Sequence, residues 1–209
     1  KKRSEIIRDI RTFLHDRDFM EVETPVLHSI YGGAAAKPFK TFHNQLEQNL
    51  FLRIALELHL KRLVVGGFEK IFEIGRVFRN EGISWKHNPE YTLLELYQAY
   101  ADYEDIMKLT EDLVSSLVYK TFGTYKIIYQ EQELNFKPPF TRLTLRAALL
   151  KYAGVDMNDD LDSLRTQAKK FGLDISTKPL KGQIINFIYD KTVEQNLIDP
   201  VFIIDYPWE

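Results

Sequence analysis

The chain has 209 residues, of which 44% are hydrophobic and 13% are aromatic, and this is enough for one core of ordinary density with a small appendage. It contains 28 Lys and Arg against 30 Asp and Glu, a formal net charge of -2, which argues against a dedicated basic nucleic-acid-binding domain. It has no cysteine, so it can form no disulfide or thiolate metal site. We therefore expect a reducing compartment, by default the cytoplasm.

The apolar residues are not arranged for targeting or for membrane insertion. The N-terminal stretch is amphipathic and is not an uninterrupted apolar segment, so no signal peptide is predicted. No apolar run reaches the roughly 18 to 20 residues that a membrane span needs. We expect no membrane partner.

The first part of the chain predicts one helix and several short strands. Ser4 can cap a helix that runs to about Asp18, because apolar residues recur there at helical spacing. Residues 19–24 alternate as a strand does, and Pro25 stops them. After a loop of small residues at 32–36, two further strands are predicted at 39–42 and 50–54.

A helix and a long hairpin are predicted next. Residues 57–65 have helical periodicity and end at Gly66 and Gly67. Strands are predicted at 70–79 and 91–100, joined by the polar stretch 80–89. The pair predicts an antiparallel hairpin with a large tip, and long ordered loops are often functional.

The second half of the chain is richer in helices. We predict a long helix over 103–122 and a short hairpin over 125–136. Three more helices are predicted at 144–152, 161–171 and 181–195, and a short strand at 201–204. The whole pattern predicts an α+β fold.

The long hairpin carries an unusual set of polar side chains. Tyr91, Leu93, Glu95 and Tyr97 share one face by the period of two, and Arg79 on the neighbouring strand can point the same way. Charged groups on a packed face are costly unless they are paired. Spacing alone leaves two interpretations open, a structural ion pair between Arg79 and Glu95 or a ligand cleft.

Other familiar motifs are absent from the sequence. It contains neither a G-x-x-x-x-G-K-[ST] loop nor a G-x-G-x-x-G turn. The acidic residues near Asp156 lack the glycine and glutamate of a calcium loop, and the histidines lack zinc-ligand spacing. We predict no metal site.

A resemblance to a known family extends over much of the chain. The segment FRNEGISWKHNPEYTLLELYQAYADY at 78–103 resembles the second signature motif of class II aminoacyl-tRNA synthetases, in the form of the lysyl enzymes. EVETP at 21–25 resembles the first motif, and GGAAAKPF at 32–39 and LRIA at 52–55 follow in the family's order. The similarity covers at least residues 1–122, and Tyr206 and Pro207 with Glu209 resemble the start of a later family segment.

The resemblance implies an architecture. It implies a class II synthetase-like antiparallel sheet that carries the site and is flanked by helices. Residues 1–139 would form the catalytic core with the first two motifs, 140–199 a mostly helical insertion, and 200–209 the start of a returning core strand.

It also implies a site for ATP. Arg79 would bridge the substrate carboxylate and the α-phosphate of ATP, a bidentate task that suits a guanidinium. Glu81 would face the adenine amino edge, and Tyr91 would stack on the adenine. His87 would reach the terminal phosphates, and Asn88 would fix the loop beside the base.

For lysine, the resemblance implies recognition of two ammonium groups by carboxylates. It places Glu95 near the α-ammonium, with help from the backbone of Gly33, and it places Glu57 with Tyr97 near the ε-ammonium. Leu56 stands where the lysyl enzymes usually have proline. We expect Arg79, Glu57 and Glu95 to converge on one open pocket.

The implied partners go beyond these two substrates. Magnesium ions are expected in the full-length enzyme, with ligands and the third family motif beyond Glu209, and tRNA(Lys) is the expected acceptor. A homodimer would form through the N-terminal helix and the strand that ends at Pro25. Without the third motif and an anticodon-reading barrel, we expect the 209 residues alone to activate lysine poorly.

Three other functions stay open on the sequence. A paralogue of the lysyl enzymes that attaches lysine to a translation factor would share the hairpin. A non-catalytic synthetase-like module would dimerise through the first helix and bind neither substrate. An aspartyl or asparaginyl enzyme would need a cation facing the substrate side chain, whereas Glu57 suits an ammonium.

Overall fold

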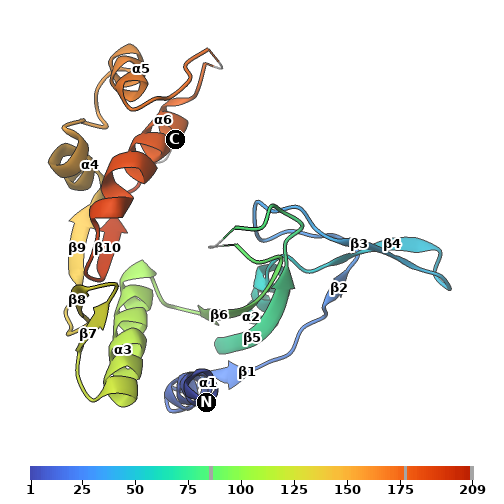
Figure 1. Cartoon of the computed structure of the whole chain (residues 1–209). Helices are drawn as coiled ribbons and strands as arrows, with labels where there is room; N and C mark the ends of the chain where they lie inside the picture. Colours follow the sequence, from blue (N-terminus) through green and yellow to red (C-terminus); the bar gives the residue numbers. More distant parts are fainter. Residues whose placement is uncertain (85–86, 177, 208–209) are drawn as a thin grey trace. The chain divides into compact units, whose positions relative to one another are not determined.

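A computed structural model describes residues 1–84, 87–176 and 178–207 (Figure 1). The chain divides into two compact units, Lys1–Ile106 and Met107–Glu209. Trp85 and Lys86 of the family-like loop, and Glu209 of the expected returning segment, lie outside the described residues.

The first unit begins with a helix that differs slightly from the predicted one. Helix α1 spans Lys2–His15, so Ser4 lies inside it and does not cap it, and Lys1 takes the capping position without a side-chain hydrogen bond. The helix ends before Asp18 because the backbone of Asp18 turns to a φ of 64°. The Arg17 N–H then donates to the Leu14 carbonyl as the turn closes.

The β5–β6 hairpin dominates this unit. Strands β5 (Lys70–Phe78) and β6 (Glu90–Gln98) pair antiparallel, with Lys70 opposite Gln98 and Phe78 opposite Glu90. This confirms the predicted pairing. The short strand β1 (Met20–Glu21) joins the free edge of β5 in parallel.

Helix α2 packs against one face of the hairpin. It spans Glu57–Val65, as predicted. Leu60 of α2 and Leu56, the residue just before this helix, form a buried cluster with Ile71 and Val77 of β5. Tyr91, Leu93 and Tyr97 of β6 pack against this cluster. The face predicted to carry the polar residues is therefore also the face that α2 covers.

A second small sheet completes the unit. Strand β4 (Gln48–Leu52) pairs antiparallel with both β2 (Leu27–His28) and β3 (Lys40–His43). The segment that follows β4 leads directly into α2. Its backbone lies beside the long hairpin, where the Phe78 N–H donates to the Arg53 carbonyl.

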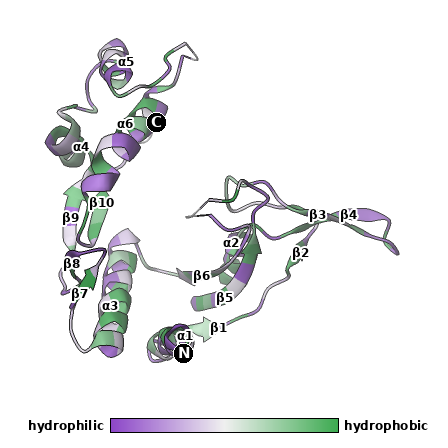
Figure 2. Ribbon diagram, in the orientation of Figure 1, coloured by the Kyte–Doolittle hydropathy of each residue, from purple (hydrophilic) through white to green (hydrophobic). Residues whose placement is uncertain are grey.

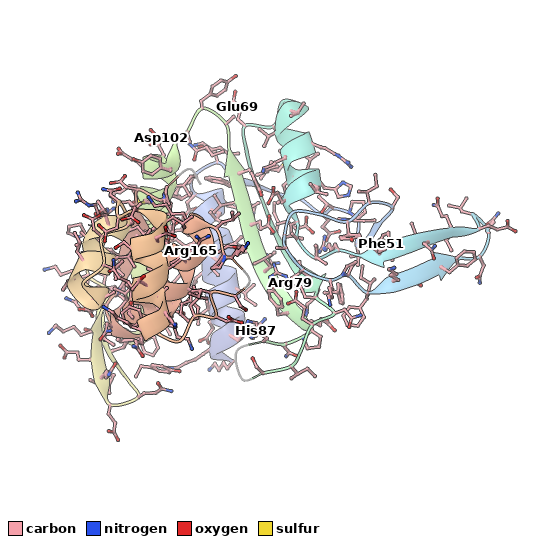
Figure 3. The ribbon with its side chains drawn as sticks, turned by 90° about the horizontal axis from the view of Figure 1, so that it is seen from above. Phe51, Glu69, Arg79, His87, Asp102 and Arg165 are labelled. Carbon is pink, nitrogen blue, oxygen red and sulfur yellow. The ribbon has the colours of Figure 1, made fainter. Side chains whose placement is uncertain are left out.

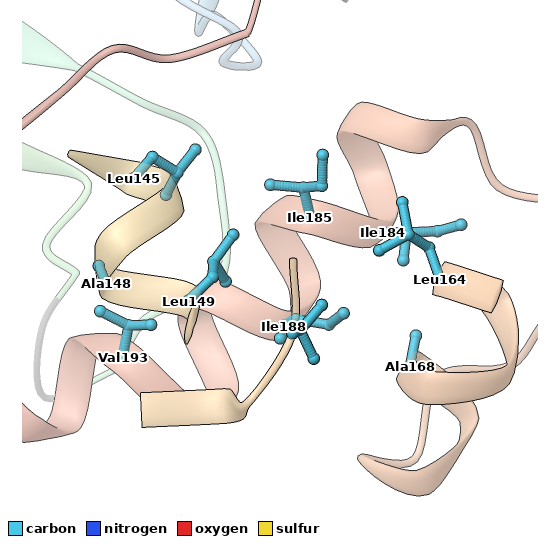
Figure 4. Packing of buried hydrophobic residues seen from close by; sticks show 10 residues of the cluster. Leu145, Ala148, Leu149, Leu164, Ala168, Ile184, Ile185, Ile188 and Val193 are labelled. Carbon is cyan, nitrogen blue, oxygen red and sulfur yellow. The ribbon is translucent and has the colours of Figure 1, made fainter. Parts of the chain in front are cut away.

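The second unit contains its own hydrophobic core. Its elements are the greater part of α3 (Tyr103–Phe122), β7 (Lys126–Tyr129), β8 (Gln132–Asn135), β9 (Thr141–Thr144), α4 (Leu145–Ala153), α5 (Leu161–Lys170), α6 (Lys181–Ile188) and β10 (Val201–Ile204). Leu149 of α4, Leu164 of α5 and Ile188 of α6 are fully buried together (Figure 4). Hydrophobic and hydrophilic stretches alternate along α6 (Figure 2), as this one-sided burial requires.

Three details of this unit differ from the prediction. Strand β9, which was not predicted, pairs in parallel with β10. Thr144 caps α4 and is not part of it, because its side chain accepts a hydrogen bond from the Ala147 N–H. The helix predicted to reach 195 ends at Ile188 and continues as a π-turn and a 3-10 turn to Asn196. The division at 139/140 into core and insertion stays a prediction.

None of the described helices is long and apolar enough to cross a membrane.

Candidate active site

A pocket of about 320 Å³ lies at the tip of the β5–β6 hairpin. Its lining residues are Arg79, Glu81, Gly82, His87, Asn88, Pro89 and Tyr91. The residues predicted to bind ATP are all among them. Figure 3 shows Arg79 near the end of the hairpin and His87 in the loop beyond it.

Arg79 is half-buried and held by the backbone around it. Its N–H donates to the Pro89 carbonyl at 2.8 Å, and its side-chain Nε donates to the Ile54 carbonyl at 3.3 Å. The guanidinium carbon lies 5.5 Å from the centroid of the Tyr91 ring, within cation–π range. Among the ion pairs of the described residues there is none between Arg79 and Glu95, so the proposed structural pair does not form.

Short-range hydrogen bonds join Ser84 to His87 at the hairpin tip. The Ser84 hydroxyl lies 2.8 Å from Nδ1 of His87, and the backbones of the two residues exchange hydrogen bonds of 3.1 and 3.2 Å. At the entrance of the loop, the Asn80 N–H donates to the Lys37 carbonyl at 2.7 Å. The exposed His87 ring therefore lies at the pocket and is held by Ser84.

Glu95 is bound from two sides on strand β6. Its Oε1 accepts a hydrogen bond from the Leu56 N–H at 2.9 Å, and its Oε2 accepts one from the Tyr97 hydroxyl at 3.1 Å. Burial, followed by the charge and the hydrogen bond of Glu95, raises the pKa of Tyr97 well above its ordinary value. The phenol therefore stays protonated and remains a donor to the carboxylate.

Glu57 and Gly33 form a second contact, at the start of α2. Gly33 has a φ of +85°, and a Cβ at this position would lie 2.9 Å from the Cβ of Glu57 and 3.1 Å from that of Ala55. Only glycine fits such an approach without strain. The Glu57 carboxylate also binds Lys61 Nζ at 2.7 Å. This is an i,i+4 pair of the kind that contributes only about 0.3–0.5 kcal/mol, so it does not commit the carboxylate to Lys61.

The contacts among the predicted lysine-binding residues differ from the pairs that the resemblance implies, and the roles of these residues stay predictions. The resemblance paired Glu95 with Gly33 and Glu57 with Tyr97, whereas the structure joins Glu57 to Gly33 and Glu95 to Tyr97. Residues 95 and 97 lie two apart on one strand, so their side chains share a face. In addition, Arg79 lines the tip pocket but Glu57 and Glu95 do not. They are linked to it through residues 54–56, which contact Arg79 at one end and Glu95 at the other.

Sequence reasoning did not identify the buried ion pair of Arg53 and Glu73. The two side chains meet at 2.6 Å, and each is only 4% exposed. Both residues stand inside hydrophobic runs, FLRIA and IFEIG. Opposite charges in two such runs are the signal that predicts a buried pair.

Metal binding has no support among the described residues. They contain no group of three His, Asp or Glu side chains arranged to hold a metal ion. We assign no magnesium ligand to this part of the protein, and no step below depends on one. That such ligands follow Glu209 stays a prediction.

Comparison with known proteins defines the class. The profile of a family described as tRNA synthetases class II (D, K and N) matches residues 1–209, and the chain belongs to this family.

Curated proteins that are similar to the chain carry a more specific name than the family does. The chain is 53% identical over 211 residues to "Lysine--tRNA ligase" of Thermoanaerobacter sp. (strain X514), covering 100% of this chain and 42% of that relative. It is 54% identical over 207 residues to the protein of the same name from Moorella thermoacetica, covering 98% of this chain and 42% of that protein. Against the one from Bacillus cereus (strain B4264) it is 51% identical, covering 99% and 42%.

The chain therefore spans less than half the length of these relatives. Their names favour neither the translation-factor paralogue nor the non-catalytic module. The family description includes the D and N enzymes, but the quoted relatives are all named for lysine.

Proposed function

We propose that the full-length protein containing this chain is a lysine–tRNA ligase, which activates lysine with ATP and transfers it to tRNA(Lys). One observation carries the proposal. The pocket at Arg79 adjoins a backbone segment, residues 54–56, that also holds Glu95 and leads into Glu57. Arg79, a cation suited to phosphate and to the substrate carboxylate, is thus connected to Glu57 and Glu95, whose carboxylates suit ammonium groups.

Activation joins the lysine carboxylate to the α-phosphate of ATP. A carboxylate oxygen attacks the α-phosphorus, the bond to the bridging oxygen breaks, and pyrophosphate leaves with its electron pair. Both reactants are anionic, so a positioned cation lowers the barrier by neutralising charge that builds up in the transition state. The planar fork of Arg79 can contact both groups together, which a lysine ammonium does less well.

The other pocket residues suit the remainder of ATP. Tyr91 offers an aromatic face for the adenine, and the Glu81 carboxylate can accept from the adenine amino group. His87 is exposed at the pocket and would reach the terminal phosphates, and Asn88 would fix the loop beside the base. These roles follow the family resemblance, and their support is that the four side chains line one pocket with Arg79.

We revise the roles of the residues that bind lysine. The Arg79 N–H donates to the carbonyl of Pro89, the residue just before β6. Glu95 and Tyr97 lie farther along β6. A substrate whose carboxylate meets Arg79 would extend its side chain along β6. We therefore assign the ε-ammonium to Glu95 with Tyr97 and the α-ammonium to Glu57 with Gly33.

The finer architecture and the partners are part of the same proposal. We take the β5–β6 hairpin as the antiparallel sheet that carries the site, with residues 140–199 as a mostly helical insertion. The expected homodimer would use α1 and the strand ending at Pro25. Exposed apolar side chains near that strand, Met20 at 52% and Val26 at 40%, support a contact there. Analytical ultracentrifugation of the full-length protein tests the dimer, and a cytoplasmic location stays a prediction.

Lysine-dependent exchange of pyrophosphate into ATP tests the activity directly. The full-length protein should catalyse exchange with lysine, and far more slowly with ornithine, aspartate or asparagine. Exchange that depends on aspartate or asparagine would assign the protein to another branch of its family. No exchange with any amino acid would refute the proposed activity.

A further inference from the structure

Arg53 and Glu73 form a buried ion pair that takes no direct part in the proposed reaction. Arg53 Nη1 lies 2.6 Å from Glu73 Oε1, and the two residues are 4% and 3% exposed. Removing two charges from water is unfavourable unless the geometry and further hydrogen bonds compensate for it. The surroundings of this pair supply such hydrogen bonds.

The guanidinium of Arg53 connects three segments of the first unit. Its Nε donates to the Arg76 carbonyl at 2.8 Å, and its Nη1 also donates to the Thr24 carbonyl at 3.0 Å. The Thr24 hydroxyl donates to Glu73 Oε2 at 2.6 Å and lies 3.3 Å from Arg53 Nη1. The planar fork of an arginine serves these diverging acceptors at once, whereas a lysine ammonium is a single point of charge.

Gly75 provides the space that this arrangement needs. A Cβ added at residue 75 would lie 2.2 Å from Arg53 Nη2 and 3.1 Å from Glu73 Oε1. Glycine weakens a strand interior, and it often marks a close approach by another group. The glycine in the middle of β5 is explained by the guanidinium that lies against it.

The backbone that follows Arg53 reaches the proposed site on both sides. The Arg53 carbonyl accepts from the Phe78 N–H at 2.9 Å, next to Arg79. The Ile54 carbonyl accepts from Arg79 Nε, and the Leu56 N–H donates to Glu95. A side chain that holds residue 53 in place therefore also holds residues 53–56. This segment lies between Arg79, which would contact the reacting phosphate and carboxylate, and Glu95, which would contact a substrate ammonium.

We propose that Arg53, held by Glu73 and Thr24, is a positioning residue for amino acid activation, which it serves by fixing residues 53–56 between Arg79 and Glu95. This role rests on the proposed function. It differs from a role in stability alone, because it predicts a loss of activity in molecules that are fully folded.

The Arg53→Lys substitution in the full-length protein tests the role. It keeps the positive charge beside Glu73 but removes the fork that reaches Arg76 and Thr24. Lysine-dependent exchange is measured per folded molecule, with the folded fraction taken from circular dichroism and the active fraction from the stoichiometry of bound adenylate. We expect kcat/KM for lysine to fall about 10- to 100-fold, because small displacements of reacting groups have effects of this size.

Arg142→Lys is the matched control. Arg142 pairs with the buried Glu111 in the second unit, so the same substitution is made in another ion pair of an arginine with a buried glutamate, in which the arginine is 31% exposed. It should leave kcat/KM for lysine per folded molecule unchanged. Equal values for Arg53→Lys and Arg142→Lys would overturn the positioning role and leave Arg53 a stabilising residue.

A milder pair of variants decides the matter if Arg53→Lys does not fold. Thr24→Val removes the hydroxyl that bonds Glu73 while keeping the shape of the side chain, and Thr24→Ser keeps the hydroxyl. We expect kcat/KM for lysine per folded molecule to fall about two- to tenfold in Thr24→Val, as for one lost hydrogen bond, and to be retained in Thr24→Ser. Equal activity in both variants would refute the role.

The proposed function and the role of Arg53 fail in different ways. If the unsubstituted protein shows no lysine-dependent exchange, the proposed function fails and the role of Arg53 falls with it. If that protein is active, the substitutions at residues 53 and 24 alone decide the role.

Discussion

The Leu56 N–H donates a hydrogen bond of 2.9 Å to Glu95, and this contact ties the start of α2 to strand β6. The donor belongs to the backbone, so any residue at position 56 can supply it except proline, which has no N–H. The other oxygen of Glu95 is held by Tyr97. The carboxylate is therefore oriented before any substrate arrives, which reduces the entropy lost on binding.

The Glu95→Gln substitution should weaken lysine binding while preserving the fold. Glutamine keeps an acceptor for the Leu56 N–H but loses the charge that attracts an ammonium. A hydrogen bond to a charged group contributes about 1.5–3 kcal/mol, so the dissociation constant for lysine should rise at least about tenfold. Calorimetric titration of lysine into the full-length protein measures this. Unchanged affinity would remove Glu95 from the lysine site.

The Arg79→Lys substitution should slow activation much more than it lowers stability. Loss of a positioned donor to the transition state reduces kcat by about 10²- to 10³-fold, and lysine cannot reproduce the bidentate contact. Arg76→Lys is the control on the same strand, since the Arg76 side chain is 56% exposed and pairs with Glu90 at 3.6 Å. Comparable exchange rates in the two variants would contradict the role of Arg79.

The Gly33→Ala substitution should raise the KM for lysine. The new methyl would meet Glu57 Cβ at 2.9 Å and push that side chain aside, and the φ of +85° adds strain of about 1–2 kcal/mol. Gly67→Ala separates the two effects, because Gly67 also has a positive φ but has no atom within 4 Å of the added Cβ. Both variants should lose stability, and only Gly33→Ala should lose affinity for lysine. Steady-state kinetics with varied lysine, alongside thermal unfolding, distinguishes them.

The pair of Glu111 and Arg142 should make the second unit sensitive to acid. Burial by itself raises the pKa of Glu111, but hydrogen bonds from Arg142 and the Phe140 N–H outweigh it and lower the pKa below its ordinary value. The resulting stabilisation is complete above the ordinary pKa of about 4.5. It is lost as the pH falls through the lower pKa of the folded state.

The Glu111→Gln variant tests this dependence on pH. It should be less stable than the unsubstituted protein at pH 7, by about 1–3 kcal/mol, and the difference should shrink below about pH 4.5 as the native glutamate is protonated. Hydrogen–deuterium exchange of peptides from residues 140–153, followed over pH, measures it. A difference that stays constant from pH 7 to pH 3 would contradict the account.

The fold could be predicted where one local rule decides the structure. Helix α2 and the β5–β6 hairpin follow from periodicity, because the apolar faces of these elements are buried within one unit. The pairing of β9 with β10 could not be predicted in this way. The two strands are far apart in sequence, and nothing local in Thr141–Thr144 indicates which partner it takes.

The candidate site likewise has one part that could be predicted from the sequence and one part that could not. The ATP residues come from one continuous hairpin, so likeness of sequence was enough to group them in the pocket at Arg79. The contacts of Glu57 and Glu95 depend on how residues 31–33 and 54–57 fold beside the hairpin. Patterns within a strand do not contain that information, because the contact of Glu57 with Gly33 and the fixed orientation of Glu95 depend on the tertiary fold.

Binding of two stable adenylate analogues tests the central claim most directly. One analogue carries lysine and the other norleucine, which has nearly the same shape without the ε-ammonium. The full-length protein should bind the lysyl analogue at least about tenfold more tightly. Glu95→Gln should abolish most of this preference, and Glu57→Gln should keep it while weakening both analogues. If Glu57→Gln abolished the preference and Glu95→Gln kept it, the assignment of the two carboxylates would be contradicted.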